Sequence, residues 1–199
     1  MRDRADKVTR IAGGNRYETA AQMALPQYEA DRVYLTSGTG WADAVSVGAV
    51  AGDNDALLLT KSDQLPQATS AALSALDPSE VIIVGGRNAV AGGITAEVRA
   101  AAPGAAVTRV AGADRYETAA ELAAEYGDLT GNVVVATGAD FADALSAGQL
   151  GDPLLLTHPG HLTQATATAL SDASSVTIIG GHLAVSSKTE HQLLDVLGR

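Results

Sequence analysis

The sequence repeats itself once along nearly its whole length. Residues 10–20 read RIAGGNRYETA and residues 109–119 read RVAGADRYETA, so eight of the eleven positions are identical. Three more segments of the first half recur in the same order in the second half, namely 38–48 at 138–148, 56–69 at 153–166 and 81–90 at 176–185. A repeat of this length indicates a duplicated structural unit, and we place the two units at residues 8–104 and 105–199.

Each unit alternates short apolar runs with segments of helical pattern. Apolar runs without polar alternation are typical of strands that are buried on both faces of a parallel sheet. We expect strands at residues 8–11, 32–36, 56–60 and 80–84, and again at 107–110, 133–137, 154–157 and 176–179. A helix is expected after each strand, in the first unit at about 17–25, 42–51, 67–76 and 95–101. Thr95 is the candidate N-cap of the last of these helices.

Eight strand–helix units predict an α/β protein in which right-handed crossovers connect parallel strands. Two architectures satisfy this pattern. The first is a pair of tandem three-layer units, each a parallel sheet flanked by helices. The second is a (βα)8 barrel with two-fold sequence symmetry, and 199 residues lie at the short end of the range for that fold.

The composition excludes several classes of function. The formal net charge is −10 and no run of five or six basic residues occurs, so we expect no nucleic-acid partner. The chain has no cysteine, which excludes disulfides, cysteine-ligated zinc and a cysteine nucleophile. No apolar run approaches the ~18 residues of a membrane span. In so acidic a chain, an anionic ligand requires a local basic pocket.

Arg16 and Arg115 occupy matching positions, each after a glycine-rich break and at the start of an expected helix. A cation at a helix N-terminus opposes the helix dipole, so another group should offset its charge. One interpretation is that the arginine and the helix amides bind a carboxylate or a phosphate group. The alternative is an ion pair with a carboxylate of this chain, for which the candidates are Asp43, Asp143, Glu18 and Glu117.

A second repeated motif, W/F-A-D-A-V/L-S, follows a glycine loop in each unit. It supplies four more candidate ligand-binding residues, which are Trp41, Asp43, Phe141 and Asp143. An aspartate at the carboxyl end of a strand could bind a metal or a hydroxyl group, or it could cap the first turn of the helix. The aromatic residue could stack on a sugar ring, or it could fill the core.

No motif for catalysis or for a cofactor is present. The glycine pairs at 85–86 and 180–181 lie in neither a G-x-x-x-x-G-K-[ST] nor a G-x-G-x-x-G pattern, and tight turns explain them. The serines of the W/F-A-D-A-V/L-S motif lie in no G-x-S-x-G nucleophile elbow. His158 and His161 have no histidine counterparts in the first unit, so they form no duplicated metal site. We therefore predict no catalytic residue, no metal site and no cofactor.

Four ordered motifs, each present twice, carry a resemblance: R-I/V-A-G-x-N/D-R-Y-E-T-A, G-x-x-W/F-A-D-A-V/L-S, A/P-L-L-L-T and V/I-I-x-G-G-x-x-A-V. The set resembles the cell-wall-binding repeat 2 family of Gram-positive surface-layer proteins, cell-wall hydrolases and adhesins. The resemblance implies Toprim-like or Rossmann-like units, typically three around a pseudo-threefold axis. It implies a non-catalytic anchor that binds an anionic cell-wall polysaccharide or a teichoic-acid-like polymer. The family's arginine falls on Arg16 and Arg115, and its leucine strand on residues 57–59 and 154–156.

The resemblance sets the expected location and partners. We expect a secreted protein of the cell wall or cell surface, whose export signal lies outside this chain. Because two units are present rather than three, further repeat units or a homo-oligomer would cover the face that is left open. Two other hypotheses remain at this point. One is an enzyme that acts on a phosphorylated small molecule, and the other is a structural protein that forms a surface lattice.

Overall fold

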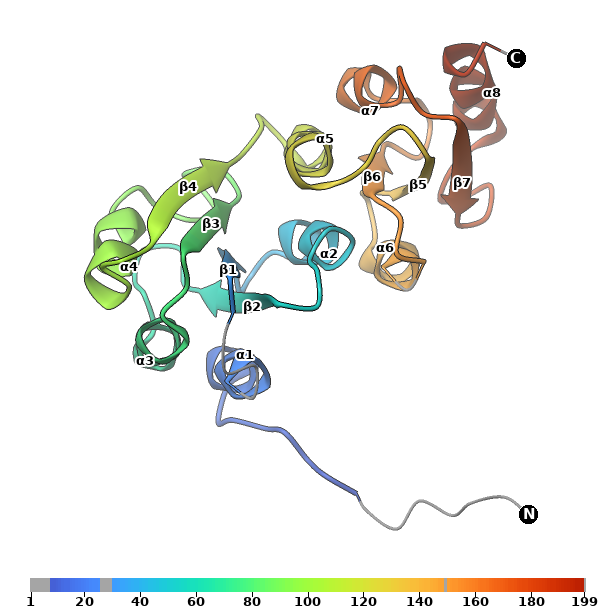
Figure 1. Ribbon diagram of the computed structural model, residues 1–199. Coiled ribbons are helices and arrows are strands. Elements are labelled where there is room, and N and C mark those ends of the chain that lie inside the picture. Colours follow the sequence, from blue (N-terminus) through green and yellow to red (C-terminus); the bar gives the residue numbers. More distant parts are fainter. Residues whose placement is uncertain (1–7, 26–29, 149, 199) are drawn as a thin grey trace.

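The strands form two open parallel sheets (Figure 1) in a computed structural model that describes residues 8–25, 30–148 and 150–198. The first sheet has the order β2-β1-β3-β4 and the second has the order β6-β5-β7. The strands are β1 (Arg32–Ser37), β2 (Asp55–Thr60), β3 (Glu80–Val84), β4 (Ala106–Val110), β5 (Asn132–Thr137), β6 (Leu154–Thr157) and β7 (Ser175–Ile179). Two separate sheets confirm the prediction of tandem α/β units and exclude the closed barrel.

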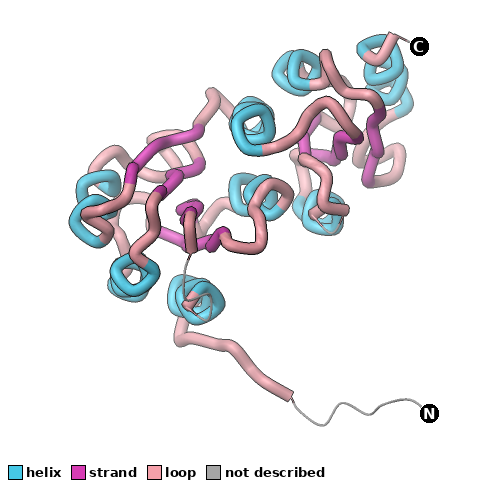
Figure 2. The backbone as a smooth tube through the Cα atoms, in the orientation of Figure 1, coloured by secondary structure: helices cyan, strands magenta, loops and turns pink. Residues whose placement is uncertain are grey.

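Helices cover both faces of each sheet, as the cyan coils around the magenta strands in Figure 2 show. They are α1 (Arg16–Ala24), α2 (Ala42–Gly48), α3 (Gln67–Leu76), α4 (Ile94–Ala101), α5 (Arg115–Tyr126), α6 (Phe141–Ala147), α7 (Gln164–Ala169) and α8 (Ser187–Val196). In the first unit, α1, α3 and α4 cover one face and α2 covers the other. No helix in the described part of the chain is long and apolar enough to cross a membrane.

The expected first strand, residues 8–11, is not a strand, and the prediction was wrong there. Its repeat partner is β4, which pairs in parallel with β3, so that Val107 lies beside Val81 and Val110 beside Val84. The strand that opens the second repeat therefore completes the sheet of the first unit. Residues 8–11 have the same local sequence pattern, but the described chain offers them no sheet edge in the equivalent place. The boundaries 8–104 and 105–199 stay a prediction about the sequence repeat, and β4 belongs by its pairing to the first sheet.

Two helix boundaries also differ from the expectation. The helix α2 ends at Gly48 rather than at residue 51. Thr95 lies inside the first turn of α4, because the helix begins one residue earlier and Gly93 is its N-cap. The side-chain cap expected from Thr95 is therefore wrong.

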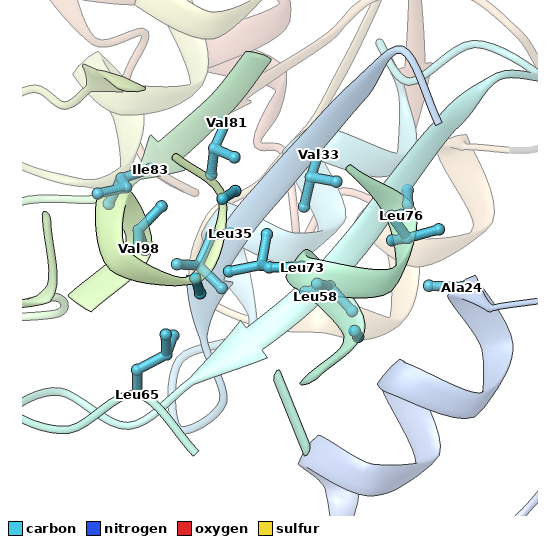
Figure 3. Packing of buried hydrophobic residues seen from close by; sticks show 14 of the residues in the cluster. Ala24, Val33, Leu35, Leu58, Leu65, Leu73, Leu76, Val81, Ile83 and Val98 are labelled. Atoms are coloured by element: carbon cyan, nitrogen blue, oxygen red, sulfur yellow. The ribbon is translucent and has the colours of Figure 1, made fainter. Parts of the chain in front are cut away.

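The main core of the first unit lies between its sheet and the helices α1, α3 and α4 (Figure 3). Leu35, Leu58 and Ile83 point from three neighbouring strands toward Leu73 of α3 and Val98 of α4, and all five are fully buried. Branched aliphatic side chains on adjacent parallel strands give a continuous apolar surface, against which an amphipathic helix can bury one side.

The opposite face of the first sheet is covered partly by the second unit. Tyr34 and Ile82 pack there against Val47 of α2 and against Leu122 of α5. In return, Trp41, the N-cap of α2, and Val45 of α2 pack against the core of the second sheet. The helices α2 and α5 are thus shared by both units, which explains their position between the two sheets in Figure 1.

Replacing Leu122 by alanine tests this shared packing. Leu122 is 0% exposed although it belongs to the second repeat. We expect Leu122→Ala to lower the free energy of unfolding by about 2–5 kcal/mol, because it leaves a cavity between the units. Urea titration measures this loss. Leu183→Ala is the matched control, since Leu183 is 99% exposed, and it should change stability by less than about 0.5 kcal/mol. Equal effects of the two substitutions would contradict the shared core.

Candidate functional site

Both candidate arginines occupy the first position of a helix whose start is fixed by the same hydrogen bonds. At α5 the Asp114 carboxylate accepts bonds of 2.9 Å from two backbone N–H groups of the first turn. Glu117 reaches back and accepts a bond of 2.6 Å from the N–H of Ala113. Asn15 and Glu18 make the equivalent bonds at α1. Because these groups satisfy the helix N-terminus, the arginine side chain is available for other contacts.

Arg115 lies over an aromatic ring of the other unit. Its Cζ atom is 5.5 Å from the centroid of the Trp41 ring, which is a cation–π distance. Its Nη1 atom donates a hydrogen bond of 2.7 Å to the carbonyl oxygen of Gly138. Arg16 makes the equivalent hydrogen bond to the carbonyl oxygen of Gly38. The repeat therefore holds both guanidinium groups in the same local way, but only Arg115 meets a tryptophan.

The ion pairs that were the alternative explanation for these arginines are absent from the described ranges. The salt bridges found there join Arg32 to Asp55 at 3.5 Å and to Glu80 at 3.0 Å. Arg16 and Arg115 are both solvent-exposed residues. The positive charge at both positions is therefore accessible to an anion from solvent.

Asp43 lies in the first turn of α2, within electrostatic reach of Arg115. Burial raises the pKa of the Asp43 carboxyl, and the positive charge of Arg115 offsets part of the rise. The capping interpretation was wrong for both aspartates, because the N-cap residues are Trp41 for α2 and Asp140 for α6. Across the part of the chain that the structure describes, no three His, Asp or Glu side chains are grouped to hold a metal ion.

Trp41, Asp43 and Arg115 line one groove between the two units. The groove has a volume of about 710 Å³ and also contains Arg87. Its residues come from the loop that follows β1, the start of α2, the loop that follows β3 and the start of α5. These segments meet because carboxyl ends of parallel strands share one edge of the sheet, which is where open α/β proteins bind ligands.

Positive charge gathers beside this groove. Arg109 donates a hydrogen bond of 2.7 Å to the carbonyl oxygen of Gly85. Burial lowers the pKa of Arg109, and the nearby positive charge of Arg87 lowers it further. The sequence reasoning missed Arg87, because His182 replaces it in the second unit and the repeat comparison gave it no weight. Its position three residues after the end of β3 was the signal that could have identified it.

The repeat partners of these groove residues do not meet in a second groove within the described chain. They are Phe141, Asp143 and Arg16. Phe141 lies 6.4 Å from Trp41, measured between ring centroids, and it is 52% exposed. Asp143 lies in the first turn of α6, while Arg16 lies at the start of α1 in the other unit. Within the described residues, an aromatic ring, a carboxylate and a guanidinium group come together in one place.

Gly85 brings the end of β3 close to Asp43. Its φ is +113°, and a Cβ atom on Gly85 would lie 2.6 Å from Oδ2 of Asp43. We expect Gly85→Ala to destabilise the protein by about 1–3 kcal/mol, because the left-handed φ disfavours a side chain and the new methyl group displaces the carboxylate. Gly86→Ala is the matched control, since the nearest atom to its Cβ is 3.9 Å away. Thermal unfolding of both variants checks the prediction, and an undisturbed Gly85→Ala protein would contradict this geometry.

Comparison with known proteins places the repeat in a described family. The family model for Cell wall binding domain 2 (CWB2) matches residues 10–95 and 109–190. N-acetylmuramoyl-L-alanine amidase LytC of Bacillus subtilis (strain 168) is 33% identical, over 94% of this chain and 39% of its own length. The amidase enhancer of the same organism is 30% identical, over 92% of this chain and 26% of its own length. The chain therefore spans less than half of either relative.

Two solved structures share the fold over nearly the whole chain. Cwp6 from Clostridium difficile matches with a TM-score of 0.84 and 28% identity, over 98% of this chain and 34% of that one. Cwp8 from the same organism matches with a TM-score of 0.82 and 27% identity, over 94% of this chain and 33% of that one. The arrangement of both repeats, and not only the fold of one unit, is thus similar to that in known proteins.

Proposed function

The chain belongs to the cell wall binding domain 2 family, and on that premise we propose that it attaches to the cell wall by binding an anionic wall polymer in the groove between its two units. The proposed ligand is an anionic polysaccharide or a teichoic-acid-like polymer. In this proposal the chain is a non-catalytic anchor that acts at the cell surface after secretion. Further repeat units or a homo-oligomer would extend the binding surface.

The observation that carries the proposal is the guanidinium of the exposed residue Arg115 over the Trp41 ring, with no carboxylate of the described chain in an ion pair with it. A guanidinium group binds phosphate or carboxylate oxygens with two parallel hydrogen bonds. The Trp41 ring packs between this guanidinium and the core of the second sheet, so it positions Arg115 in the groove. The groove therefore offers a positioned cation to an anionic group of the polymer.

The charge of the whole protein makes this local arrangement necessary. A chain with a formal net charge of −10 repels a polyanion at long range. Arg87 and Arg115 in the groove, with Arg109 close to Arg87, counter that repulsion locally. Binding of such a polymer should weaken with salt, because attraction between exposed charges is screened beyond about 8–10 Å at physiological ionic strength.

Replacing Arg115 by alanine tests the site. We expect Arg115→Ala to reduce retention on purified cell walls by about tenfold to a hundredfold, because hydrogen bonds to charged groups contribute about 1.5–3 kcal/mol. Arg16→Ala is the matched control, since Arg16 makes the same hydrogen bond to its own unit but has no tryptophan beside it. Sedimentation of each variant with wall fragments measures retention, and circular dichroism checks the fold. Full retention by a folded Arg115→Ala protein would reject the site.

The raised pKa of Asp43 predicts the direction in which wall binding should change with pH. At neutral pH the ionised carboxylate opposes an anion near Arg115, and protonation removes this opposition as the pH falls through the raised pKa. Wall binding by the unaltered protein should therefore strengthen as the pH falls through the raised pKa of Asp43. Asp43→Asn should bind more tightly at neutral pH and lack this part of the dependence. Binding isotherms of both proteins on the same walls check it, since titration of the walls themselves affects both equally. Parallel pH profiles would contradict the role of Asp43.

A further inference from the structure

Each unit contains a groove between two of its own helices, in addition to the groove between the units. In the first unit it lies between the first turns of α1 and α3 and has a volume of about 500 Å³. In the second unit it lies between α5 and α7 and has a volume of about 530 Å³. Both volumes are in the range of small-molecule sites. We name them the α1–α3 groove and the α5–α7 groove, and no arginine of the described chain lines either one.

The two grooves share four residue types at equivalent positions. The first helix of each pair supplies a tyrosine and a glutamate, and the second helix supplies a glutamine and an alanine. These residues are Tyr17 and Tyr116, Glu18 and Glu117, Gln67 and Gln164, and Ala68 and Ala165. Elsewhere the units differ in their charged residues, as Arg87 and His182 show. The shared set therefore defines what a ligand common to both grooves can contact.

The tyrosine ring has a fixed position in both grooves. The ring of Tyr17 packs on Gly38, where a Cβ atom would lie 2.5 Å from the Cε1 atom of the tyrosine. The ring of Tyr116 packs on Gly138 in the same way. A side chain at either glycine would displace the ring, so each glycine makes room for the tyrosine beside its groove. A tyrosine hydroxyl group both donates and accepts hydrogen bonds.

The glutamine comes from the other helix of each pair, where it is the first residue. Gln67 and Gln164 are both exposed. In the α5–α7 groove, Nε2 of Gln164 donates a hydrogen bond of 3.2 Å to Oγ1 of Thr168, one turn further along α7. A carboxamide has two N–H donors and a carbonyl acceptor, which match the amide group of another molecule. Each groove thus combines a hydroxyl group with a carboxamide.

Alanines form the apolar part of each groove. Ala120 and Ala165 line the α5–α7 groove, and Ala68 and Ala71 line the α1–α3 groove. Their methyl groups give a flat apolar surface, without the deep pockets that anchor large side chains of a protein partner. The grooves lie between helices and offer no strand edge to which an extended peptide can pair. This surface suits the C–H face of a sugar ring or the methyl group of an acetyl substituent.

The remaining charged side chains differ between the grooves and exclude a ligand that depends on charge. Lys61 lines only the α1–α3 groove, whereas Glu121 lines only the α5–α7 groove. The shared glutamates are already hydrogen-bonded, because Glu18 accepts a bond of 2.7 Å from the N–H of Gly14 and Glu117 makes the equivalent bond. Glu121 would repel an anion, and Lys61 would repel a cation. A ligand that both grooves accept is therefore uncharged.

We propose that each of these two grooves binds one uncharged sugar residue that carries an acetamido group. The hydroxyl groups of the sugar exchange hydrogen bonds with the tyrosine hydroxyl, and its acetamido group does so with the glutamine carboxamide. Its C–H face and its acetyl methyl group pack on the alanines. The grooves differ from that of Arg115 in place and in ligand, so the proposal goes beyond the proposed function and does not rest on it. Two such sites on one chain increase retention on any glycan that reaches both.

Titration of the whole chain with chitotetraose, an uncharged oligomer of N-acetylglucosamine, tests the proposal by nuclear magnetic resonance. We expect the side-chain amide signals of Gln67 and Gln164 to shift saturably. The affinity should be the same at low and at high salt, because the oligomer has no charge to be screened. The same oligomer without its acetyl groups, which is cationic, serves as the comparison ligand.

Blocking one groove at a time localises the binding. Ala71→Arg fills the α1–α3 groove and should abolish the shift of Gln67, while the shift of Gln164 remains. Thr168→Arg fills the α5–α7 groove and should have the converse effect. Ala71 and Thr168 are both exposed, so both variants should fold. Ala100→Arg is the matched control, since Ala100 is exposed on α4 and lines neither groove.

Sedimentation with cell walls identifies the source of the sugar. The measurement compares the unaltered chain with the double variant that carries Ala71→Arg and Thr168→Arg. Weaker retention of the double variant on walls stripped of their accessory polymers assigns the sugar to the glycan strands. The same loss on complete walls alone assigns the sugar to an accessory polymer.

Three results of the titration would overturn the proposal. The first is the absence of saturable shifts with chitotetraose, and the second is an unchanged shift in a groove that an arginine blocks. The third is binding of the cationic oligomer in both grooves without binding of chitotetraose. The titration contains neither cell walls nor a polyanion, so its outcome is independent of the Arg115→Ala experiment that tests the proposed function.

Discussion

The packing of α2 and α5 between the two sheets is the constraint on which the rest of the structure depends. Leu122 of α5 completes a core that lies on the first sheet, and Trp41 at the N-cap of α2 contacts a core that lies on the second. Each unit therefore buries part of its apolar surface against its neighbour, as small α/β units with few residues per core must. The pairing of β4 with β3 and the position of the groove both follow from this mutual packing.

The groove combines residues that are far apart in the sequence. Arg87 follows β3 in the first unit, while Arg115 begins α5 in the second. They gather positive charge at one place on a protein whose overall charge is strongly negative. The fold can hold exposed guanidinium groups there because Asp114 and Glu117 satisfy the amides of the helix start. The helix then positions the arginine, while the carboxylates at the helix start bind backbone amides and leave the guanidinium charge unpaired.

Much of the fold could be predicted from the sequence, because the apolar runs and the glycine breaks report local structure directly. The strand predicted at residues 8–11 was wrong, because the pattern of an edge strand is present there but no sheet edge of the described chain lies beside it. The prediction of Thr95 as an N-cap was wrong because the start of a helix depends on the preceding loop as well as on the type of the capping residue. Of the site, Arg115, Asp43 and Trp41 were expected from the repeat, whereas Arg87 was missed because its counterpart is a histidine.

The sequence by itself determined that the chain is a duplicated parallel α/β protein, that each unit carries an arginine at a helix start, and that any anion must be bound by a local basic pocket. Only the tertiary structure decided that β4 joins the first sheet and that the groove takes residues from both units. The physical reason is that local hydrogen bonds follow from local sequence, whereas packing depends on neighbours. Arg16 and Arg115 share the same helix start, yet among the residues that the structure describes only Arg115 has an aromatic ring of another unit beside it.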